Sequence, residues 1–222
     1  MVFVILIVSV YSNLSQAVSG IDSNETKSVI IIDAGHGGED GGAVVDKIVE
    51  KDINLAISKK LADIFISNGF EVITTRNDDD SVETEGNTTR ERKVSDMKHR
   101  LETFNSDEKN IVVSIHQNKF TENKYNGTQI FYSTNNPQSA VLAESIKNSV
   151  VSLIQPDNQR QCKKAGNEIY LLYNSKVPSV IVECGFISNR EEAQKLSDEN
   201  YQKQMAWAIF LGVLDFTNNN KI

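Results

Sequence analysis

Apolar runs and helix-like patterns alternate along most of the chain. Residues 29–33 form a β-branched run bounded by Gly35, which is typical of a fully buried strand. In residues 51–68, apolar side chains recur at helical spacing, at Ile53, Ile57, Leu61, Ile64 and Phe65. Gly69 follows where a helix would end in a left-handed cap. These patterns predict a buried strand followed by a helix.

The alternation continues to the end of the sequence. Further strands are predicted at residues 70–75, 111–115, 128–132, 169–173 and 180–182. Further helices are predicted at residues 90–104, 138–154 and 201–216. Strands that alternate with helices indicate an α/β fold. We predict a single domain with a twisted, mostly parallel or mixed β-sheet of about six strands and helices on both faces.

The first residues differ from the rest of the chain. Residues 2–10 form an apolar run, too short to span a bilayer as a mature helix. The run matches the apolar core of a secretory signal, with Ser15-Gln16-Ala17 as a cleavage site, although no Lys or Arg precedes Lys27. A buried N-terminal strand is the alternative. We expect a signal peptide or membrane-targeting segment, a linker, a folded domain and a polar tail, at residues 1–17, 18–27, 28–217 and 218–222.

Composition and charge narrow the function. The 222 residues include 23 Lys and Arg against 30 Asp and Glu, which gives a formal net charge of −7. Nucleic acids and anionic membrane surfaces need a basic face, so neither is expected as an electrostatic partner. Two cysteines, Cys162 and Cys184, are too few for a disulfide framework or a four-cysteine zinc site. Stability must therefore come mainly from apolar burial.

Residues suited to metal binding lie next to the predicted strands and helices. His36 lies in the glycine-rich loop after the first strand, His116 follows the strand at 111–115, and Glu50 precedes the first helix. The loop lacks the third glycine of a dinucleotide fingerprint and the lysine of a phosphate-binding loop. Two imidazoles and a carboxylate are the ligand set of a hydrolytic zinc site. Each residue alone is more often structural, and Glu50 alone would be a helix-start carboxylate.

Glu183 is the fourth candidate, because it ends the apolar run 177–182. A buried carboxylate must be paired, bind metal or take part in catalysis, since burial without a partner is costly. Beside a zinc ion it would act as general base and then as general acid. The alternative is a structural ion pair with Arg76 or Arg100.

These residues lie in segments that resemble a known enzyme family. Four segments are similar to the signatures of the zinc-dependent N-acetylmuramoyl-L-alanine amidases of the amidase-3 class: IIIDAGHGGEDGGAV, the Glu50 that follows, SIHQN and VPSVIVECGFISN. Arg76 and the Asp96-Met97-x-x-Arg100 pattern also match, and the resemblance covers residues 29–216. The compact form with an N-terminal apolar segment is similar to the germination-specific amidases of spore-forming bacteria.

The resemblance implies an activity and a set of site residues. One Zn²⁺ would be held by His36, Glu50 and His116, with Glu183 in the catalytic role. Substrate binding would fall to three further positions: Arg76, Arg100 and Asn118. The reaction would be hydrolysis of the amide between the lactyl carboxyl of N-acetylmuramic acid and L-alanine. In a spore former, this reaction would serve cortex maturation by muramic-δ-lactam formation, which germination needs.

The resemblance also implies a location and partners. Peptidoglycan would be the substrate, and the protein would be exported, to the forespore intermembrane space or cortex if it is a spore amidase. An uncleaved N-terminal segment would tether it to the membrane. Some division amidases carry an inserted helix that blocks the zinc, but only ten residues, 117–126, separate His116 from Gly127. We expect an open site, or one controlled by a separate exported accessory protein or lipoprotein.

Other interpretations remain open at this point. A zinc peptidase that cuts within the peptidoglycan stem peptides would use the same ligands and the same glutamate. A non-catalytic wall-binding protein is a third hypothesis. The acidic segment 77–89 either lines a substrate groove or is a solvated loop, and the solvated loop is the simpler interpretation.

Overall fold

The computed structural model describes residues 28–82 and 85–220. Six strands form one mixed sheet in the order β4-β1-β5-β8-β6-β7. The first four of these are mutually parallel: β4 (Glu71–Thr74), β1 (Val29–Ala34), β5 (Ile111–Asn118) and β8 (Ser179–Phe186). The other two complete the sheet, with β6 (Gln129–Tyr132) antiparallel to β8 and parallel to β7 (Lys163–Lys164). The predicted α/β fold is confirmed.

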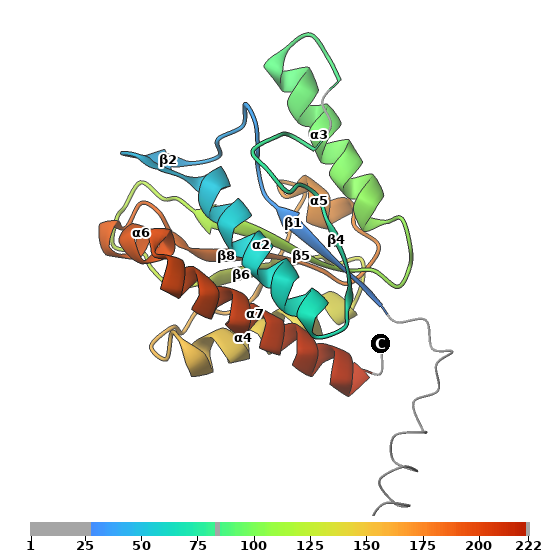
Figure 1. Ribbon diagram of the computed structural model, residues 1–222, viewed down its shortest axis with the longest axis vertical. Helices are drawn as coiled ribbons and strands as arrows, with labels where there is room; N and C mark the ends of the chain where they lie inside the picture. The colour runs from blue at the N-terminus through green and yellow to red at the C-terminus, as the bar shows by residue number, and fades with distance from the viewer. Residues whose placement is uncertain (1–27, 83–84, 221–222) are drawn as a thin grey trace, which may run out of the picture.

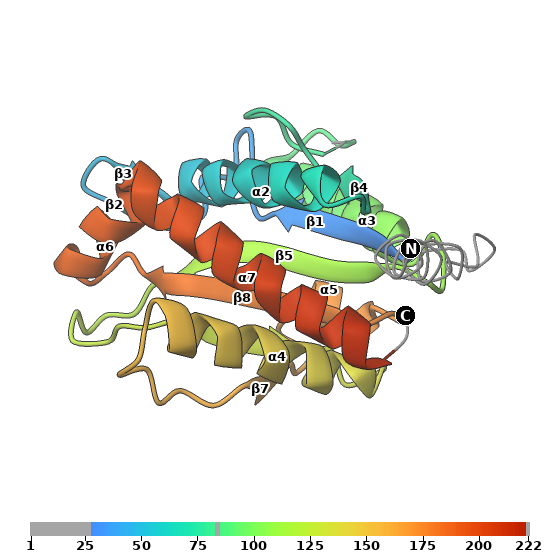
Figure 2. The ribbon, with the colours of Figure 1, turned by 60° about the horizontal axis from the view of Figure 1, so that its bottom comes forward.

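Helices cover both faces of this sheet (Figure 1). Figure 2 shows three of them side by side on one face: α2 (Glu50–Ser67), α7 (Glu199–Asn220) and α4 (Gln138–Leu153). The short helix α6 (Arg190–Ser197) packs against α7. On the opposite face, α3 (Thr89–Phe104) packs against α5 (Tyr170–Asn174) and β1. The sheet is thus covered on both sides, as its unbroken apolar strands require.

The side chains of β1 contribute to the apolar cores on both faces of the sheet. Successive side chains of a strand point to opposite sides of the sheet. Ile30 and Ile32 join the larger core under α2, α4 and α7, whereas Ile31 joins a smaller core with Phe104 of α3. All three isoleucines are fully buried. Because both faces of the sheet are covered by apolar cores, the sequence of β1 is a continuous apolar run and does not alternate between apolar and polar residues.

One strand prediction is wrong. The run 169–173 forms the helix α5 and not a strand, and a short apolar run cannot be assigned from its pattern alone. Leu171 and Leu172 provide its buried side. The sixth strand of the sheet is instead β7, an exposed lysine pair at the sheet edge that has no apolar signal.

Two further elements were not predicted. A two-stranded hairpin, β2 (Val44–Val45) and β3 (Ile48–Val49), connects the loop after β1 to α2. The hairpin ends at Val49, and α2 begins at the next residue, Glu50. The hairpin therefore fixes the position of the Glu50 carboxylate at the start of the helix. The helix α6 was also missed, although Asn189 caps it by accepting hydrogen bonds from the backbone N–H of Glu191 and Glu192.

The predictions for residues 1–17 and 18–27 lie outside the described residues. Within the described part, none of the helices combines the length and hydropathy that crossing a membrane requires. Cys162 and Cys184 are free thiols, and Cys184 is buried. At the other end, α7 continues to Asn220, past its predicted end at Phe216.

Candidate active site

The four candidate residues gather at the carboxyl ends of the parallel strands. His36 follows β1, His116 lies near the end of β5, and Glu50 begins α2. Glu183 lies in β8, where it is in register with His116. This edge of an α/β sheet is where binding sites usually form. The topology therefore brings together four residues that are far apart in sequence.

His36, Glu50 and His116 form a compact set of potential metal ligands. One ligand atom from each lies within 4.8 Å of the other two. Oε1 of Glu50 is 3.2 Å from Nε2 of His36 and 3.1 Å from Nδ1 of His116. The two imidazole rings meet edge to face with their centroids 4.9 Å apart. Two imidazole nitrogens and one carboxylate oxygen that converge in this way fit Zn²⁺ with a coordination position left for water or substrate.

Glycines make room for this cluster. A Cβ atom on Gly35 would lie 2.2 Å from Nε2 of His116, and one on Gly42 would lie 2.7 Å from Oε2 of Glu50. His36 itself has a φ of 63°, a left-handed conformation that is costly for a residue with a side chain. Close packing around His36, Glu50 and His116 therefore explains Gly35 and Gly42.

Two other residues hold His36 in this conformation. Oδ2 of Asp40 lies 2.8 Å from Nδ1 of His36, and Arg100 donates to the His36 carbonyl oxygen over 2.7 Å. Lys93 of α3 lies 3.0 Å from the Asp40 carboxylate. A carboxylate on one imidazole nitrogen fixes the tautomer that leaves the other nitrogen free for a metal. Sequence reasoning missed Asp40, and its place four residues after His36 was the only available signal.

Glu50 is held by two backbone donors. Its Oε2 accepts from the N–H of Ala43 at 2.8 Å, and its Oε1 accepts from the N–H of Gln117 at 3.0 Å. Asn54, one helical turn further, accepts from the side chain of Gln117 at 3.1 Å. The roles of Asn54 and Gln117 were not predicted. These contacts keep the Glu50 carboxylate in one orientation, as metal ligands generally are.

The electrostatics of the cluster favour a cation. Burial acts to raise the pKa of Glu50, but hydrogen bonds with His116 and His36 outweigh it and hold this pKa far below its usual range. Burial acts to lower the pKa of His36, but hydrogen bonds with Asp40 and Glu50 outweigh it and raise this pKa to about 9. The carboxylates of Glu50 and Asp40 thus favour positive charge at the two histidines. A metal cation bound where the ligand atoms meet would supply that charge.

Glu183 differs from Glu50 in its surroundings. Its Oε2 is buried and has no hydrogen-bond partner among the described residues. Burial raises the pKa of Glu183 to about 7. A carboxyl group with a pKa near neutrality is suited to accept and then donate a proton.

Arg76, expected to bind substrate, is buried instead. It donates to four backbone carbonyl oxygens, those of Ala34, Gly35, Lys51 and Asp78, at 2.8 to 3.1 Å. These bonds connect the end of β4 to the loop that carries His36 and to the first turn of α2. The structure thus gives Arg76 a positioning role, and the expected substrate contact stays a prediction.

Arg100 is also buried. It forms ion pairs with Asp33 and with Asp96, and it donates to the backbone around His36. Neither arginine pairs with Glu183, so the structural ion pair considered for Glu183 is excluded. Asn118, the third predicted substrate-binding residue, is partly exposed at the end of β5. It remains a prediction.

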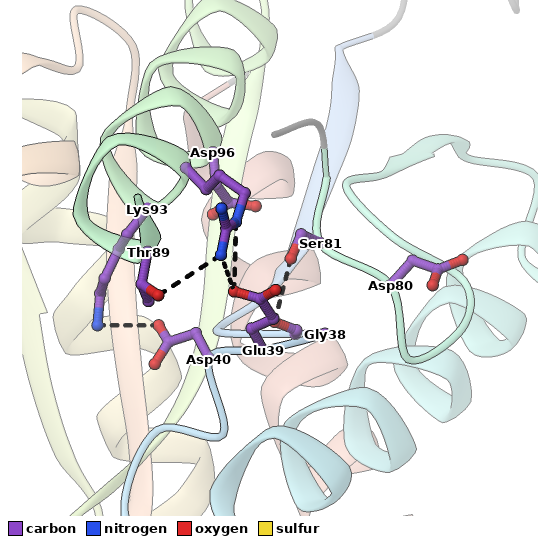
Figure 3. Close-up of a pocket in the computed structure, with 10 residues that line it drawn as sticks. Gly38, Glu39, Asp40, Asp80, Ser81, Thr89, Lys93 and Asp96 are labelled. Carbon is purple, nitrogen blue, oxygen red and sulfur yellow. Dashed lines mark hydrogen bonds and ion pairs between the residues drawn. The ribbon is translucent and has the colours of Figure 1, made fainter. Parts of the chain in front are cut away.

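The cluster is partly exposed, since the side chains of His36 and His116 are 20% and 18% accessible to solvent. After β5 ends at Asn118, the segment up to Gly127 contains turns and bends and no helix, as its length predicted. A cavity of about 540 Å³ lies between the glycine-rich loop, residues 80–81 and α3 (Figure 3). Asp40, which holds His36, is one of its lining residues.

Comparison with known proteins identifies the family. The sequence profile of the amidase-3 family, described as N-acetylmuramoyl-L-alanine amidase, matches residues 30–215. The chain belongs to the amidase-3 family. It is an N-acetylmuramoyl-L-alanine amidase that acts on peptidoglycan, and the resemblance inferred from the four motifs is confirmed.

Individual members of the amidase-3 family show a more specific similarity, to spore amidases. The germination-specific N-acetylmuramoyl-L-alanine amidase of Bacillus subtilis strain 168 is 33% identical over 189 residues, which cover 85% of this chain and 79% of that protein. The structure of the CwlD amidase from Clostridioides difficile, in complex with the GerS lipoprotein, gives a TM-score of 0.82 at 40% identity and covers 87% of this chain and 100% of that one. AmiC2 of Nostoc punctiforme gives a TM-score of 0.72 at 30% identity, with 86% and 97% covered. The predicted similarity to spore amidases is confirmed.

Proposed function

We propose that this amidase depends on one zinc ion. It separates stem peptides from N-acetylmuramic acid by hydrolysing the amide bond between the lactyl carboxyl group of the sugar and the L-alanine of the stem. The observation that carries the proposal is the convergence of His36, Glu50 and His116, with Glu183 in register beside His116. Three ligands and one free carboxyl group are the parts that metal-assisted amide hydrolysis needs.

Each residue has a defined task in this proposal. His36, Glu50 and His116 hold the zinc ion, and Asp40 orients His36. When bound, zinc supplies Lewis-acid polarisation of the scissile carbonyl group and lowers the pKa of a water molecule. Glu183 takes a proton from the attacking water and delivers it to the departing nitrogen of L-alanine. Burial of the Glu183 carboxyl group disfavours its charged form and raises its pKa to about 7, which suits this proton transfer.

We extend the proposal to the spore cortex. Removal of the stem peptide leaves a muramic acid that a separate deacetylase converts to the δ-lactam. The support is the similarity to the germination-specific amidase of B. subtilis and to CwlD of C. difficile. In this role, a strain without the gene would form cortex that lacks muramic-δ-lactam.

We also propose an extracytoplasmic location and an accessory partner. The relatives include a cell wall amidase and the CwlD amidase solved with the GerS lipoprotein, so an exported lipoprotein is the partner class we propose. Residues 1–17 would target or tether the protein, and residues 28–217 would form the catalytic domain.

Mass spectrometry of digested peptidoglycan tests the proposed reaction. The zinc-loaded protein is expected to release peptides that begin with L-alanine and to leave muramic acid without a stem. A chelator should abolish the release, and added zinc should restore it. Peptides that begin at an internal stem residue would contradict the proposal and support a peptidase.

A further inference from the structure

Charges of both signs line the cavity beside the metal cluster. The helix α3 contributes Arg92 and Lys93, and the facing loops contribute Glu39, Asp40 and Asp80. Figure 3 shows Lys93 reaching from α3 to Asp40, with Glu39 and Asp80 on the loop side. The volume of about 540 Å³ is typical of a site for a small ligand.

Some of these charges serve the protein scaffold. Asp40 is bonded to His36, and Asp96, which also lines the cavity, is bonded to Arg100 and to the backbone N–H of Val82. These two carboxylates are therefore committed to holding the metal site. A ligand in the cavity would have to use the remaining charges.

Arg92 and Glu39 form the pair that a ligand can open. Nη2 of Arg92 lies 2.6 Å from Oε2 of Glu39, and the Glu39 side chain is 64% exposed. An exposed ion pair of this kind contributes little net stability, because water competes for both partners. A ligand carboxylate can therefore replace Glu39 on the guanidinium group, which binds carboxylates through paired hydrogen bonds.

We propose that this cavity binds the stem peptide of the substrate and that Arg92 takes a peptide carboxylate in exchange for Glu39. The inference rests on the proposed function. Stem peptides carry charges of both signs, the carboxylates and the amino group of the diamino acid, whereas the N-acetylated sugars are uncharged. A lining with charges of both signs therefore favours the peptide. Asp40 both lines the cavity and contacts His36, and one extended residue spans about 3.3 Å. The cavity thus lies within a few peptide residues of the scissile amide.

The other side of the site offers a contrasting surface for the sugar. Phe120 is 46% exposed, and its ring centroid lies 5.2 Å from that of Tyr125 and 5.3 Å from that of Phe186. Phe186 is in register with Asn118, so these rings lie at the β5–β8 end of the site, away from α3 and β1. Phe186 is fully buried, so Phe120 presents the exposed ring here, and such a ring suits the apolar face of a sugar. This arrangement leaves the charged cavity for the peptide.

Kinetics on two substrates test the proposal with the zinc-loaded protein. One substrate is a muropeptide with its full stem, and the other is N-acetylmuramoyl-L-alanine methylamide, which has no further peptide carboxylate. Arg92→Gln should lower kcat/KM about tenfold on the full stem, because a charged hydrogen bond is lost, and should leave the truncated substrate unchanged. Lys98→Gln, an exposed change on the same helix outside the cavity, is the matched control and should affect neither substrate.

Binding of the product peptide gives an independent measurement, in which two variants should change the affinity in opposite directions. The tetrapeptide released by the wild type is titrated calorimetrically into each protein. Arg92→Gln should weaken its binding, and Glu39→Gln should strengthen it, because Glu39 no longer competes for Arg92.

Three outcomes would overturn the inference. Equal losses on both substrates would show a structural role for Arg92, and wild-type values for Arg92→Gln throughout would show that the cavity takes no peptide. Weaker binding of a stem-free disaccharide by Arg92→Gln would assign the cavity to sugar. Failure of the proposed function looks different, because the wild type would then release no product that begins with L-alanine from either substrate.

Discussion

Oε1 of Glu50, the first residue of α2, lies 3.1 Å from Nδ1 of His116 in β5. The same oxygen lies 3.2 Å from Nε2 of His36. One carboxylate oxygen thus links two imidazoles that come from different strand ends. A cation at their meeting point would interact with all three groups.

Replacement of Glu50 tests its role as a ligand. Glu50→Gln keeps the shape of the side chain but removes its charge, and we expect zinc affinity to fall more than about 100-fold. Zinc should raise the thermal unfolding temperature of the wild type and leave that of the variant nearly unchanged. Calorimetric zinc titration measures the affinity, with Glu102→Gln on the exposed side of α3 as the control. Wild-type affinity in Glu50→Gln would remove Glu50 from the ligand set.

Asp40 should act on the metal through His36. Asp40→Asn leaves all three ligands in place, but it weakens the contact that fixes the imidazole tautomer. Loss of such a supporting carboxylate typically lowers metal affinity about 10- to 100-fold. The same titration measures this change, and Asp63→Asn on the exposed face of α2 serves as the control. An unchanged affinity would show that the backbone alone orients His36.

Gly35 should be required because of space and not because of backbone freedom. A methyl group there would displace the His116 ring, so Gly35→Ala is expected to impair zinc binding. Gly69→Ala is the contrasting variant, since its Cβ would meet nothing within 4 Å but its φ is 80°. It should cost about 1 kcal/mol of unfolding free energy and leave zinc affinity intact. If both variants bind zinc like the wild type, the close packing at Gly35 is not essential.

Asp33 should stabilise the fold in a pH-dependent way. Burial acts to raise the pKa of Asp33, but the charge of Arg100 and hydrogen bonds from Ser114 and Thr75 outweigh it and lower this pKa below 3.8. The stabilisation is therefore complete above 3.8, the value for the unfolded chain, and is lost as pH falls through the lower folded-state pKa.

Urea unfolding of Asp33→Asn measures this contribution. At neutral pH the variant removes the fully buried partner of Arg100 and leaves its ion pair with Asp96 in place. Because breaking a buried ion pair is costly, we expect the variant to be about 3 kcal/mol less stable. The difference from the wild type should shrink in acid below the ordinary pKa of 3.8. A difference that does not change with pH would contradict the role of the Asp33–Arg100 pair.

The sequence was most informative where strands are buried on both faces. The runs that became β1, β5 and β8 are mostly apolar, and a residue suited to metal binding or catalysis follows each run or lies near its end. His36, His116 and Glu183 could be found for this reason. Glu50 had no comparable signal, and only its combination with the histidines and the resemblance to the family drew attention to it.

The supporting residues could not be predicted from local pattern. Gln117 contacts Glu50 and Asn54, which lie more than 60 residues away in sequence. Asp40 contacts His36 only four residues away, but this spacing alone does not distinguish Asp40 from the other polar residues of the loop. Arg76 and Arg100 were expected to bind substrate because of the resemblance to the family, and the structure shows both side chains buried. Backbone carbonyl groups and Asp33, which only the folded chain brings together, supply the partners that make their burial tolerable.

Zinc content and activity of Glu183→Gln, measured on one preparation, test the central claim most directly. Glu183 is outside the three-residue ligand cluster, so the variant should bind zinc like the wild type. Its kcat/KM for release of L-alanine-terminated peptides should fall about 10²- to 10⁴-fold, because no other group moves the proton. Glu191→Gln on the exposed side of α6 is the control and should retain activity. Near-wild-type activity in zinc-loaded Glu183→Gln would contradict the account, as would loss of the zinc itself.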